Sequence, residues 1–273
     1  MIGYLIGAGV FGILGVILWL VKNKKAGKSA SLELMNTSRI KDVNQNHEEM
    51  SASMGAGSFS LYVEVKGKAH SETPIESELS KEQVVYFKSE VVHEYEKLET
   101  RKTKDGTEKN WVKHKDTVSE NLRWAAGFGV KDDTGFIEVN ANKSKFHTEK
   151  LYSNFEKGDP NKDASGGLNL KIKGFSIGIG GGSKNEGLRT IGYRYTETGI
   201  RMGTQLYVVG NANDRDGTLI ISDPIDKAED FIVSVKSKQE FIGNIGSAVK
   251  GLTIGAFVSW AAAAACIVIG IIN

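Results

Sequence analysis

The chain begins with MIGYLIGAGVFGILGVILWLV (residues 1–21) and ends with GLTIGAFVSWAAAAACIVIGIIN (residues 251–273). Neither stretch contains Asp, Glu, Lys, Arg or His, whereas the residues between them are polar and charged. At about 1.5 Å of rise per residue, a helix of either length crosses a hydrocarbon core of about 30 Å. The sequence therefore predicts transmembrane helices at residues 1–21 and 251–272 that hold the intervening domain at a lipid bilayer.

Lysines lie on the polar side of both stretches. Lys22, Lys24, Lys25 and Lys28 follow the first, and Lys236, Lys238 and Lys250 precede the second. No basic residue precedes the first stretch and no small-residue cleavage site follows it, which indicates an uncleaved anchor. Because such lysines favour the cytoplasmic side, we expect a two-pass protein with a cytoplasmic domain and both termini outside. The same lysines either only set this orientation or also attract anionic headgroups, at about 1 kcal/mol each.

Small residues recur at four-residue spacing inside both stretches. The pairs are Gly3 and Gly7, Ala8 and Gly12, Gly255 and Ser259, and Ala261 and Ala265. Such faces let two helices approach closely in lipid, so they indicate a packed antiparallel helix pair or a homo-oligomer formed through the helices. The alternative is that glycine and alanine are simply common in transmembrane helices. Because neither stretch is charged, we expect no ion or proton pathway through them.

Composition limits what the domain between the helices does. The formal net charge of +2 lacks the basic excess on which counterion release from nucleic acid depends, so we expect no nucleic-acid partner. The only cysteine, Cys266, lies in the second apolar stretch. This excludes an intramolecular disulfide and a cysteine-based zinc site in the polar segment. The segment is long enough for one large β domain or two small ones.

The periodicity of the polar segment changes from helical to strand-like near residue 59. Residues 29–50 carry apolar side chains at roughly helical spacing, and residues 51–58 are rich in Gly and Ser, which is typical of a loop. From Phe59 to Gly67 apolar and polar residues alternate, as in a half-buried strand. We therefore expect a basic juxtamembrane and helical linker at residues 22–58 and a β domain at residues 59–241.

Further strand candidates follow in the rest of this segment. They lie at residues 84–96, 122–130, 136–139, 168–172, 191–195, 206–209, 219–221 and 231–235, with a hairpin turn centred on Asp105 and Gly106. Strand candidates outnumber helices, and no repeat of fixed length is visible. The predicted fold class is a mainly β, antiparallel soluble domain between two transmembrane α-helices.

No group of residues has the spacing of a catalytic or cofactor site. The glycine-rich run Gly178–Lys184 departs from the phosphate-loop pattern G-x-x-x-x-G-K-[ST] and suits a strand end or bulge. The five histidines lack a metal-ligand spacing, and no serine lies in a G-x-S-x-G motif. The carboxylates of Glu90–Glu99 lie beside basic residues, as on a solvated face. We expect no catalytic residue, no cofactor and no metal.

Several short segments resemble, in their order along the chain, the GIDE domain, which is also called BAM (beside a membrane). They are Thr37–Ile40, Val63–Ala69, Thr73–Leu79, Val84–Val91, Glu197–Gly203, Leu206–Gly210, Asp223–Pro224 and Phe231–Ser237, with Trp111 after the fourth. Each motif is weak by itself, being made of glycines, a proline or apolar alternation. Their order between two membrane helices carries the resemblance, which covers most of residues 37–241.

The resemblance implies a domain that recognises or senses a partner. Eukaryotic members of this family are mitochondrial or chloroplast-envelope E3 ubiquitin ligases, in which a RING finger follows the second helix. Their domain lies on the side of the membrane opposite the RING, whereas the lysines here indicate the cytoplasmic side. This sequence ends at Asn273 with one cysteine, too few for the zinc ligands of a RING, so we expect no ligase chemistry in these residues.

These observations predict a membrane-tethered, non-catalytic sensor or interaction module with a protein partner at the membrane surface. Candidate binding residues are Glu64, Lys66, Tyr86, Trp111, Glu197 and Tyr207, although the aromatic ones also suit core positions or cross-strand pairs. Two alternatives stay open. One is a component of a RING-type E3 ubiquitin transferase system whose RING is supplied by another chain, and the other is a lipid-binding or envelope-stress protein.

Overall fold

The computed structural model of the chain divides into two compact units. The helix unit comprises Met1–Thr37 and Lys236–Asn273, and the β unit comprises Ser38–Val235. The structure describes residues 2–103, 106–158, 169–172, 175–178, 187–227 and 229–272. Most of the glycine-rich run Gly178–Lys184, and Asp105 at the predicted hairpin turn, lie outside these residues.

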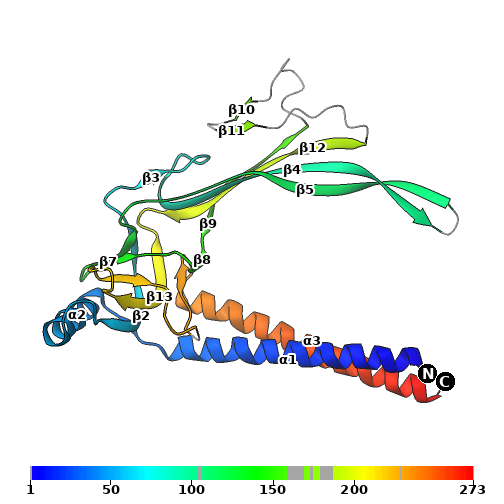
Figure 1. Ribbon diagram of the computed structural model, residues 1–273, viewed down its shortest axis with the longest axis horizontal. Coiled ribbons are helices and arrows are strands. Elements are labelled where there is room, and N and C mark those ends of the chain that lie inside the picture. The colour runs from blue at the N-terminus through cyan, green and yellow to red at the C-terminus, as the bar shows by residue number, and fades with distance from the viewer. Residues whose placement is uncertain are drawn as a thin grey trace. The chain divides into compact units, whose positions relative to one another are not determined.

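The helix unit consists of two long helices, α1 (Ile2–Leu34) and α3 (Lys238–Ile272). They pack against each other antiparallel, so the two ends of the chain lie together (Figure 1). Both helices are long and apolar enough to cross a membrane, and apolar side chains such as Ile6 and Ile271 are exposed on their outer surface. The packed antiparallel pair that the small residues indicated is present, and a homo-oligomer stays a prediction.

Among the glycines of the two helices, Gly15 makes the closest approach to the opposite helix. A Cβ atom at Gly15 would lie 2.3 Å from the Nε1 atom of Trp260, far inside van der Waals contact. Gly7 and Gly255, which the four-residue spacing singled out, also face the opposite helix, whereas a Cβ at Gly3 would meet nothing within 4 Å. The spacing therefore identifies some of the packing positions and misses the closest one.

The helices extend beyond the apolar stretches, and the linker between them and the sheet is not one helix. α1 continues through the lysine cluster to Leu34, and α3 begins at Lys238. A second helix, α2 (Ile40–Met54), follows after a break. The helical pattern over residues 29–50 is interrupted because strand β1 (Thr37–Ser38) is extended and lies next to β2 (Ser60–His70) in a sheet. The domain limits drawn from the sequence stay predictions.

One sheet of the β unit contains a closed ring of strands. The sheet order is β1, β2, β6 (Gly129–Lys131), β7 (Phe136–Val139), β14 (Ile220–Ser222), β13 (Gln205–Asn213), β15 (Ile232–Ser234) and β8 (Lys145–His147). Because β2 also pairs with β13, strands β2, β6, β7, β14 and β13 close on themselves. The pairs β14–β7 and β15–β8 are parallel, and the pairings of β2 with β13 and β6 are antiparallel.

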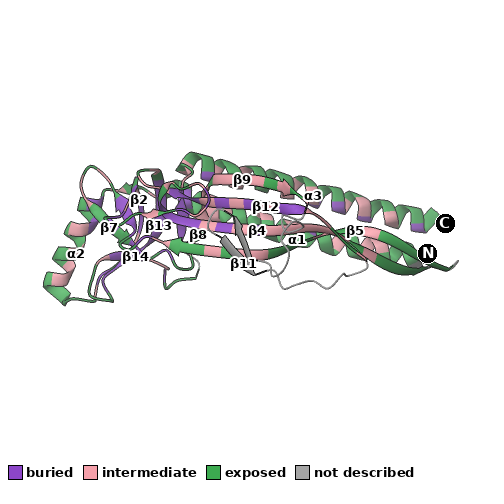
Figure 2. Cartoon of the chain, turned by 90° about the horizontal axis from the view of Figure 1, so that it is seen from above, coloured by how far each residue is buried: buried purple, intermediate pink, exposed green. Residues whose placement is uncertain are grey.

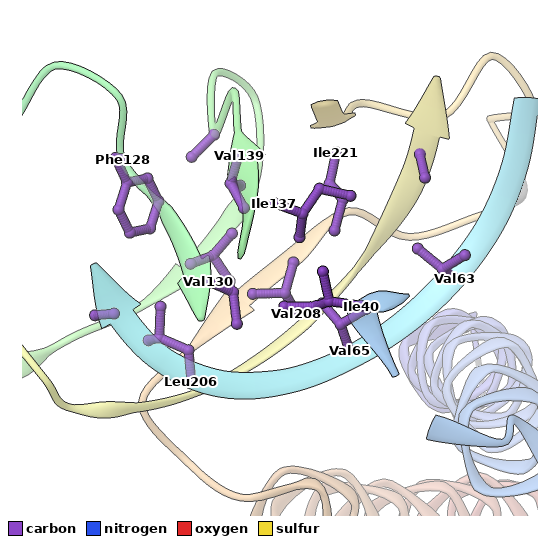
Figure 3. Packing of buried hydrophobic residues seen from close by; sticks show 14 of the residues in the cluster. Ile40, Val63, Val65, Phe128, Val130, Ile137, Val139, Leu206, Val208 and Ile221 are labelled. Carbon is purple, nitrogen blue, oxygen red and sulfur yellow. The ribbon is translucent and has the colours of Figure 1, made fainter. Parts of the chain in front are cut away.

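The hydrophobic core lies inside this closed ring. Alternate residues of β2 and β13 point inward and meet side chains of β6, β7 and β14 (Figure 3). The labelled residues of these strands and of the segment before β6 are Val63, Val65, Leu206, Val208, Phe128, Val130, Ile137, Val139 and Ile221, each at most 4 % exposed. Ile40 of α2 packs against the same cluster. Full burial of such a side chain contributes about 1.5–3 kcal/mol, so the ring contributes strongly to the stability of the β unit.

The second large sheet is built on the longest strands of the chain. Its order is β3 (Ile75–Glu76), β4 (Gln83–Thr103), β12 (Leu188–Arg201) and β9 (Glu149–Lys157), and β5 (Gly106–Trp124) also pairs with β4. Strands β10 (Asn169–Ile172) and β11 (Phe175–Gly178) form a separate hairpin. The pairing of β12 with β4 ends at Leu188 and Lys97. Beyond it, residues 98–103 and 106–111 pair with each other, and we call them the distal ribbon. The far end of β5 is exposed (Figure 2).

The mainly β, antiparallel fold class is confirmed, with differences in detail. Strands β8, β9 and all of β5 before residue 122 are not predicted, because their side chains are largely polar or charged and show no clear apolar alternation. The two-residue strands β1 and β3 are too short to show a pattern. The strand predicted over residues 122–130 is interrupted between Trp124 and Gly129. Gly127 has φ +59° there, a left-handed conformation that glycine adopts readily, so the chain turns at this point.

Candidate functional site

Strand β2 has two faces of different chemistry. Val63 and Val65 point into the core, and the residues that alternate with them on the other face are Glu64, Lys66, Lys68 and His70. On the neighbouring strand β13, Tyr207 lies directly opposite Lys66, and Val209 lies opposite Glu64. The pairing of β2 with β13 thus brings together three of the six predicted binding residues, Glu64, Lys66 and Tyr207.

Glu64 is a fully buried carboxylate that contacts two polar side chains, those of Tyr207 and Lys66. The Tyr207 hydroxyl donates to Glu64 Oε2 at 3.3 Å, and Lys66 Nζ lies 3.3 Å from Glu64 Oε1. Lys66 Nζ also lies 5.9 Å from the centre of the Tyr207 ring, within the range of a cation–π contact. Burial, and then the charge and hydrogen bond of Glu64, raise the pKa of Tyr207 well above its usual value. The phenol therefore stays protonated and remains a donor.

An open groove of about 600 Å³ lies beside this cluster, and we call it the Lys66 groove. It is lined by Lys66, Gly67, Lys68, Ala69, His70, Lys131, Asp132, Asp133, Met202, Gly203 and Gln205. Lys68 and Lys131 are cross-strand neighbours in the pairing of β2 with β6. Like charges in this relation repel each other. In the described part of the chain, neither ammonium group has an ion-pair partner within 4 Å.

The two aspartates of the groove have different roles. Asp132 Oδ2 accepts the N–H of Ile40 at 3.0 Å, and Asp132 Oδ1 accepts the N–H and hydroxyl of Thr134, both at 2.7 Å, and the N–H of Gly135 at 2.9 Å. Burial raises the pKa of the Asp132 carboxyl, but these hydrogen bonds outweigh burial and hold it below its usual value. Asp132 therefore fixes the start of α2, whereas the exposed Asp133 is available to a bound group.

Tyr86 lies among packed aromatic rings rather than on the groove. Its ring centre is 4.1 Å from that of Trp124, its cross-strand neighbour on β5, and 5.1 Å from that of Phe146. Burial raises the pKa of Tyr86. This placement suits packing between the strands, and a direct binding role for Tyr86 stays a prediction.

Glu197 is a buried carboxylate that holds a turn of the chain. Its Oε2 accepts the N–H of Leu79 at 2.9 Å, and its Oε1 accepts the N–H of Ser80 at 3.0 Å. The next residue, Lys81, has φ +60°, which is uncommon outside glycine. The carboxylate thus fixes the connection between β3 and β4.

Trp111 lies at the base of the distal ribbon, away from the other predicted residues in the strand pairing. It is opposite Leu98 of β4, and the guanidinium carbon of Arg189 lies 3.8 Å from the centre of a Trp111 ring. A half-exposed indole stacked on a cation is a contact surface in its own right, and its use in binding stays a prediction.

Asp214 is a buried residue that the sequence does not single out. Its Oδ2 accepts the N–H of Gly57 at 2.9 Å and lies 3.1 Å from His47 Nε2, and its Oδ1 accepts the N–H of Phe59 at 3.0 Å. Burial raises the pKa of Asp214, but these bonds lower it below its usual value. The Ser51 hydroxyl reaches the same Oδ2 at 3.4 Å. Serine and histidine both contact the aspartate rather than each other, so this is not the relay of a catalytic triad.

The geometry of the described residues suits non-covalent recognition. No group of three or more His, Cys, Asp or Glu side chains among them is placed to hold a metal ion. The Lys66 groove offers ammonium groups on β2 and β6, the carboxylate of Asp133 and the side-chain amide of Gln205. These groups are complementary in charge to a polar surface that carries negative charge opposite the lysines.

The comparisons with known proteins give one finding. Residues 95–269 match the family model GIDE, described as E3 ubiquitin ligase, from the outer part of β4 to the last turn of α3. The match begins at residue 95. The resemblance of the four segments between Thr37 and Val91 therefore rests on the sequence pattern alone. Neither the curated proteins nor the solved structures gave a match. Because the match covers well over half of the chain, the chain belongs to the GIDE family.

Proposed function

We propose that this chain is a membrane-tethered, non-catalytic interaction module that binds a protein partner through the Lys66 groove. The observation that carries the proposal is the pair Lys68 and Lys131, opposite each other in an open groove without an ion-pair partner in the described structure. Carboxylates on a partner would relieve this repulsion, and a donor on the partner would satisfy Asp133. A partner surface with acidic residues beside a hydrogen-bond donor is therefore complementary.

The tether is supported by the helix unit and by the family. Both ends of the β unit continue into apolar helices, so a membrane-inserted helix pair would hold the unit at two points. Tethering confines the groove to the membrane surface and raises its effective concentration towards other membrane-bound proteins. The lysines Lys22, Lys24 and Lys25 support a cytoplasmic position for the β unit and an outside position for both termini.

The groove is tested by photo-crosslinking in the full chain in its own membrane. A photoreactive amino acid at Gln205, which pairs with Lys68 in the register of β13 with β2, should form a defined protein adduct. The double variant Lys68→Glu, Lys131→Glu should abolish the adduct, because it reverses the charge that the partner recognises. The matched control Lys109→Glu, Lys113→Glu on β5 makes the same change of charge and should keep it. The proposal would be overturned if the adduct still formed in the groove variant, or if it were lost in both the groove variant and the β5 control.

The sidedness of the β unit is tested by cysteine labelling. With Cys266→Ala to remove the native thiol, Ser153→Cys places a single thiol on an exposed position of β9. A membrane-impermeant reagent should label it only after cell lysis. Labelling of intact cells would contradict the cytoplasmic position.

A component of a ubiquitin transferase system is the second candidate, because the family description names an E3 ubiquitin ligase. In this case a RING supplied by another chain would act on the partner that the β unit holds. The crosslinked partner should then carry ubiquitin in cells that contain the full chain and lose it when the groove variant replaces the wild type. An unmodified partner in both strains would argue against the ligase role and leave the interaction module in place.

A further inference from the structure

The two helices of the helix unit share a polar extension beyond their apolar stretches. In α1 the extension runs from Lys22 to Leu34, and in α3 it runs from Lys238 to Lys250. Each is about 13 residues long, which corresponds to about 20 Å of helix. Outside the part that is apolar enough to lie in lipid, both helices therefore continue for the same length.

The contacts between the helices fix which residues lie at the same height. A Cβ at Gly7 would lie 3.5 Å from Cys266 Sγ, and a Cβ at Gly255 would lie 3.4 Å from Leu18 Cδ1. In an antiparallel pair each step forward on α1 is a step back on α3. These contacts place Lys250 at about the height of Lys24, so both apolar stretches end at one level.

Four lysines surround the helix pair at this level, and we call them the headgroup collar: Lys22, Lys24, Lys25 and Lys250. Lys24, Lys25 and Lys250 are exposed and Lys22 is half-buried. The nearest acidic residues along the helices are Glu33 and Glu240, about two turns or more away in each case. Within the described residues, none of the four ammonium groups has an ion-pair partner within 4 Å.

The height of the collar matches one layer of a bilayer. Headgroup regions add about 5–7 Å on each side of the hydrocarbon core, and Lys22 to Lys25 span about 5 Å along the helix axis. A cluster of four like charges at this height requires anions to offset its mutual repulsion. Phosphate groups are the anions of that layer, and lysine side chains reach them easily because their long stems are flexible.

We propose that the headgroup collar binds the phosphate groups of anionic phospholipids and gives the helix pair a preference for them. The inference rests on the membrane insertion assumed in the proposed function. It goes beyond orientation, because a lysine that only sets the topology needs no selective lipid contact once the protein is inserted. Lys250 contributes from the opposite helix, so the site exists only where α1 and α3 are paired.

The test compares lipid binding by the full chain in neutral detergent, using native mass spectrometry. The probes are phosphatidylglycerol and phosphatidylcholine with identical acyl chains, and soluble glycerol phosphate. Wild type should prefer phosphatidylglycerol, and Lys24→Gln, Lys25→Gln, Lys250→Gln together should reduce the preference by about 100-fold, at about fivefold per lysine. The triple Arg variant at the same positions should retain it, since the charges are kept.

A matched control separates the collar from net charge. Lys41→Gln, Lys97→Gln, Lys113→Gln removes three exposed charges from the β unit and should leave the preference unchanged. An equal loss in this control, or no preference in wild type, would overturn the inference. Binding of glycerol phosphate as tight as that of the lipid would also overturn it, because the site would then recognise a soluble phosphate.

Alkaline extraction of membranes distinguishes this inference from the proposed function. Wild type and the Gln variant should both stay in the membrane pellet, because the apolar stretches are unchanged. If wild type is extracted, the membrane tether itself fails. If both stay in the pellet and only the lipid preference is absent, the collar fails and the tether stands.

Discussion

The closed ring of the first sheet and the distal ribbon of the second are both antiparallel β structure, but they are supported differently. In the ring each strand has two neighbours and a face buried in the core. In the distal ribbon, as far as the structure describes it, the two strands pair with each other and have one further backbone hydrogen bond, from the Leu98 N–H to the Gly187 carbonyl. The side chains described there are exposed or half-buried. An isolated two-stranded hairpin is at best marginally stable in water. The ring therefore supports itself through its core, whereas the ribbon depends on the sheet from which it extends.

The polar contacts of the two regions differ in the same way. Near the ring, the Tyr207 hydroxyl donates to Glu64 at 3.3 Å in a buried setting. On β4, next to the distal ribbon, the Tyr95 hydroxyl donates to Asp116 at the shorter distance of 2.7 Å, but water reaches this pair. Water competes for an exposed hydrogen bond and replaces it when it is lost. Burial, rather than distance, should therefore rank these contacts.

The largest expected difference is between a buried apolar side chain of the ring and an exposed one beside the distal ribbon. Ile221→Ala removes a fully buried side chain from the ring and should lower the free energy of unfolding by about 2–5 kcal/mol. Val112→Ala, near the distal ribbon, alters a side chain that is 36 % exposed and should change it by less than about 0.5 kcal/mol. Denaturant unfolding of the full chain in detergent measures both. Equal losses would show that the ribbon shares the core of the ring.

The two tyrosine–carboxylate hydrogen bonds give a matched pair of variants. Tyr207→Phe leaves the buried Glu64 carboxylate without one of its donors and should lower the free energy of unfolding by about 1–3 kcal/mol. Tyr95→Phe removes the shorter bond to Asp116 and should cause no measurable loss. The same unfolding experiment applies. A larger effect for Tyr95→Phe would mean that distance matters more than burial here.

Acidification should lower the free energy of unfolding of the β unit through Asp132, which lies next to β6 of the ring. The folded-state pKa of its carboxyl lies below the usual value, so its contribution to stability is fully present above about pH 4 and is lost as the pH falls through the lowered pKa. Unfolding measured between pH 6 and pH 2 should therefore show a loss of stability at the acid end that is smaller in Asp132→Asn. The neighbour Asp133 serves as the control, because its carboxylate accepts none of the bonds that fix α2. An identical effect of Asp133→Asn would contradict this role of Asp132.

The sequence predicts most of the ring, because its strands bury one face. The alternation of Val63 and Val65 with Glu64 and Lys66 reports the two faces of β2 directly, and the burial of β7 alternates in the same way. Strand β13 is buried on both faces after Gln205, and its apolar residues 206–209 predict it as a buried run. Strand β5 buries no face, so its sequence carries no such alternation. Before residue 122, its pattern resembles that of a charged loop. Local patterns thus indicate strands only where the fold gives the two faces different surroundings.

The candidate site is predictable only in part, for a related reason. Glu64 and Lys66 stand out as charged residues within an apolar alternation, which the sequence shows. Their meeting with Tyr207 depends on the register of β2 with β13, which joins segments more than a hundred residues apart. Asp214 lies in a polar run that looks like a solvated turn, and only the fold reveals that it accepts the amides of Gly57 and Phe59.

Shortening the distal ribbon should cost little stability, and it tests directly whether the ring or the ribbon carries the binding surface. Because Lys97 and Val112 are cross-strand neighbours, an Asn-Gly turn can join them in place of residues 98–111. The deletion removes the cation–π contact of Arg189 with Trp111, the exposed ion pair of His114 with Glu99 and the hydrogen bond from the Leu98 N–H to the Gly187 carbonyl. Together these should contribute only about 1 kcal/mol. The crosslink at Gln205 should persist if the partner binds the Lys66 groove. If the crosslink is lost while the free energy of unfolding stays nearly unchanged, the fold is intact and the ribbon itself is required for binding. This result would place the partner on the ribbon.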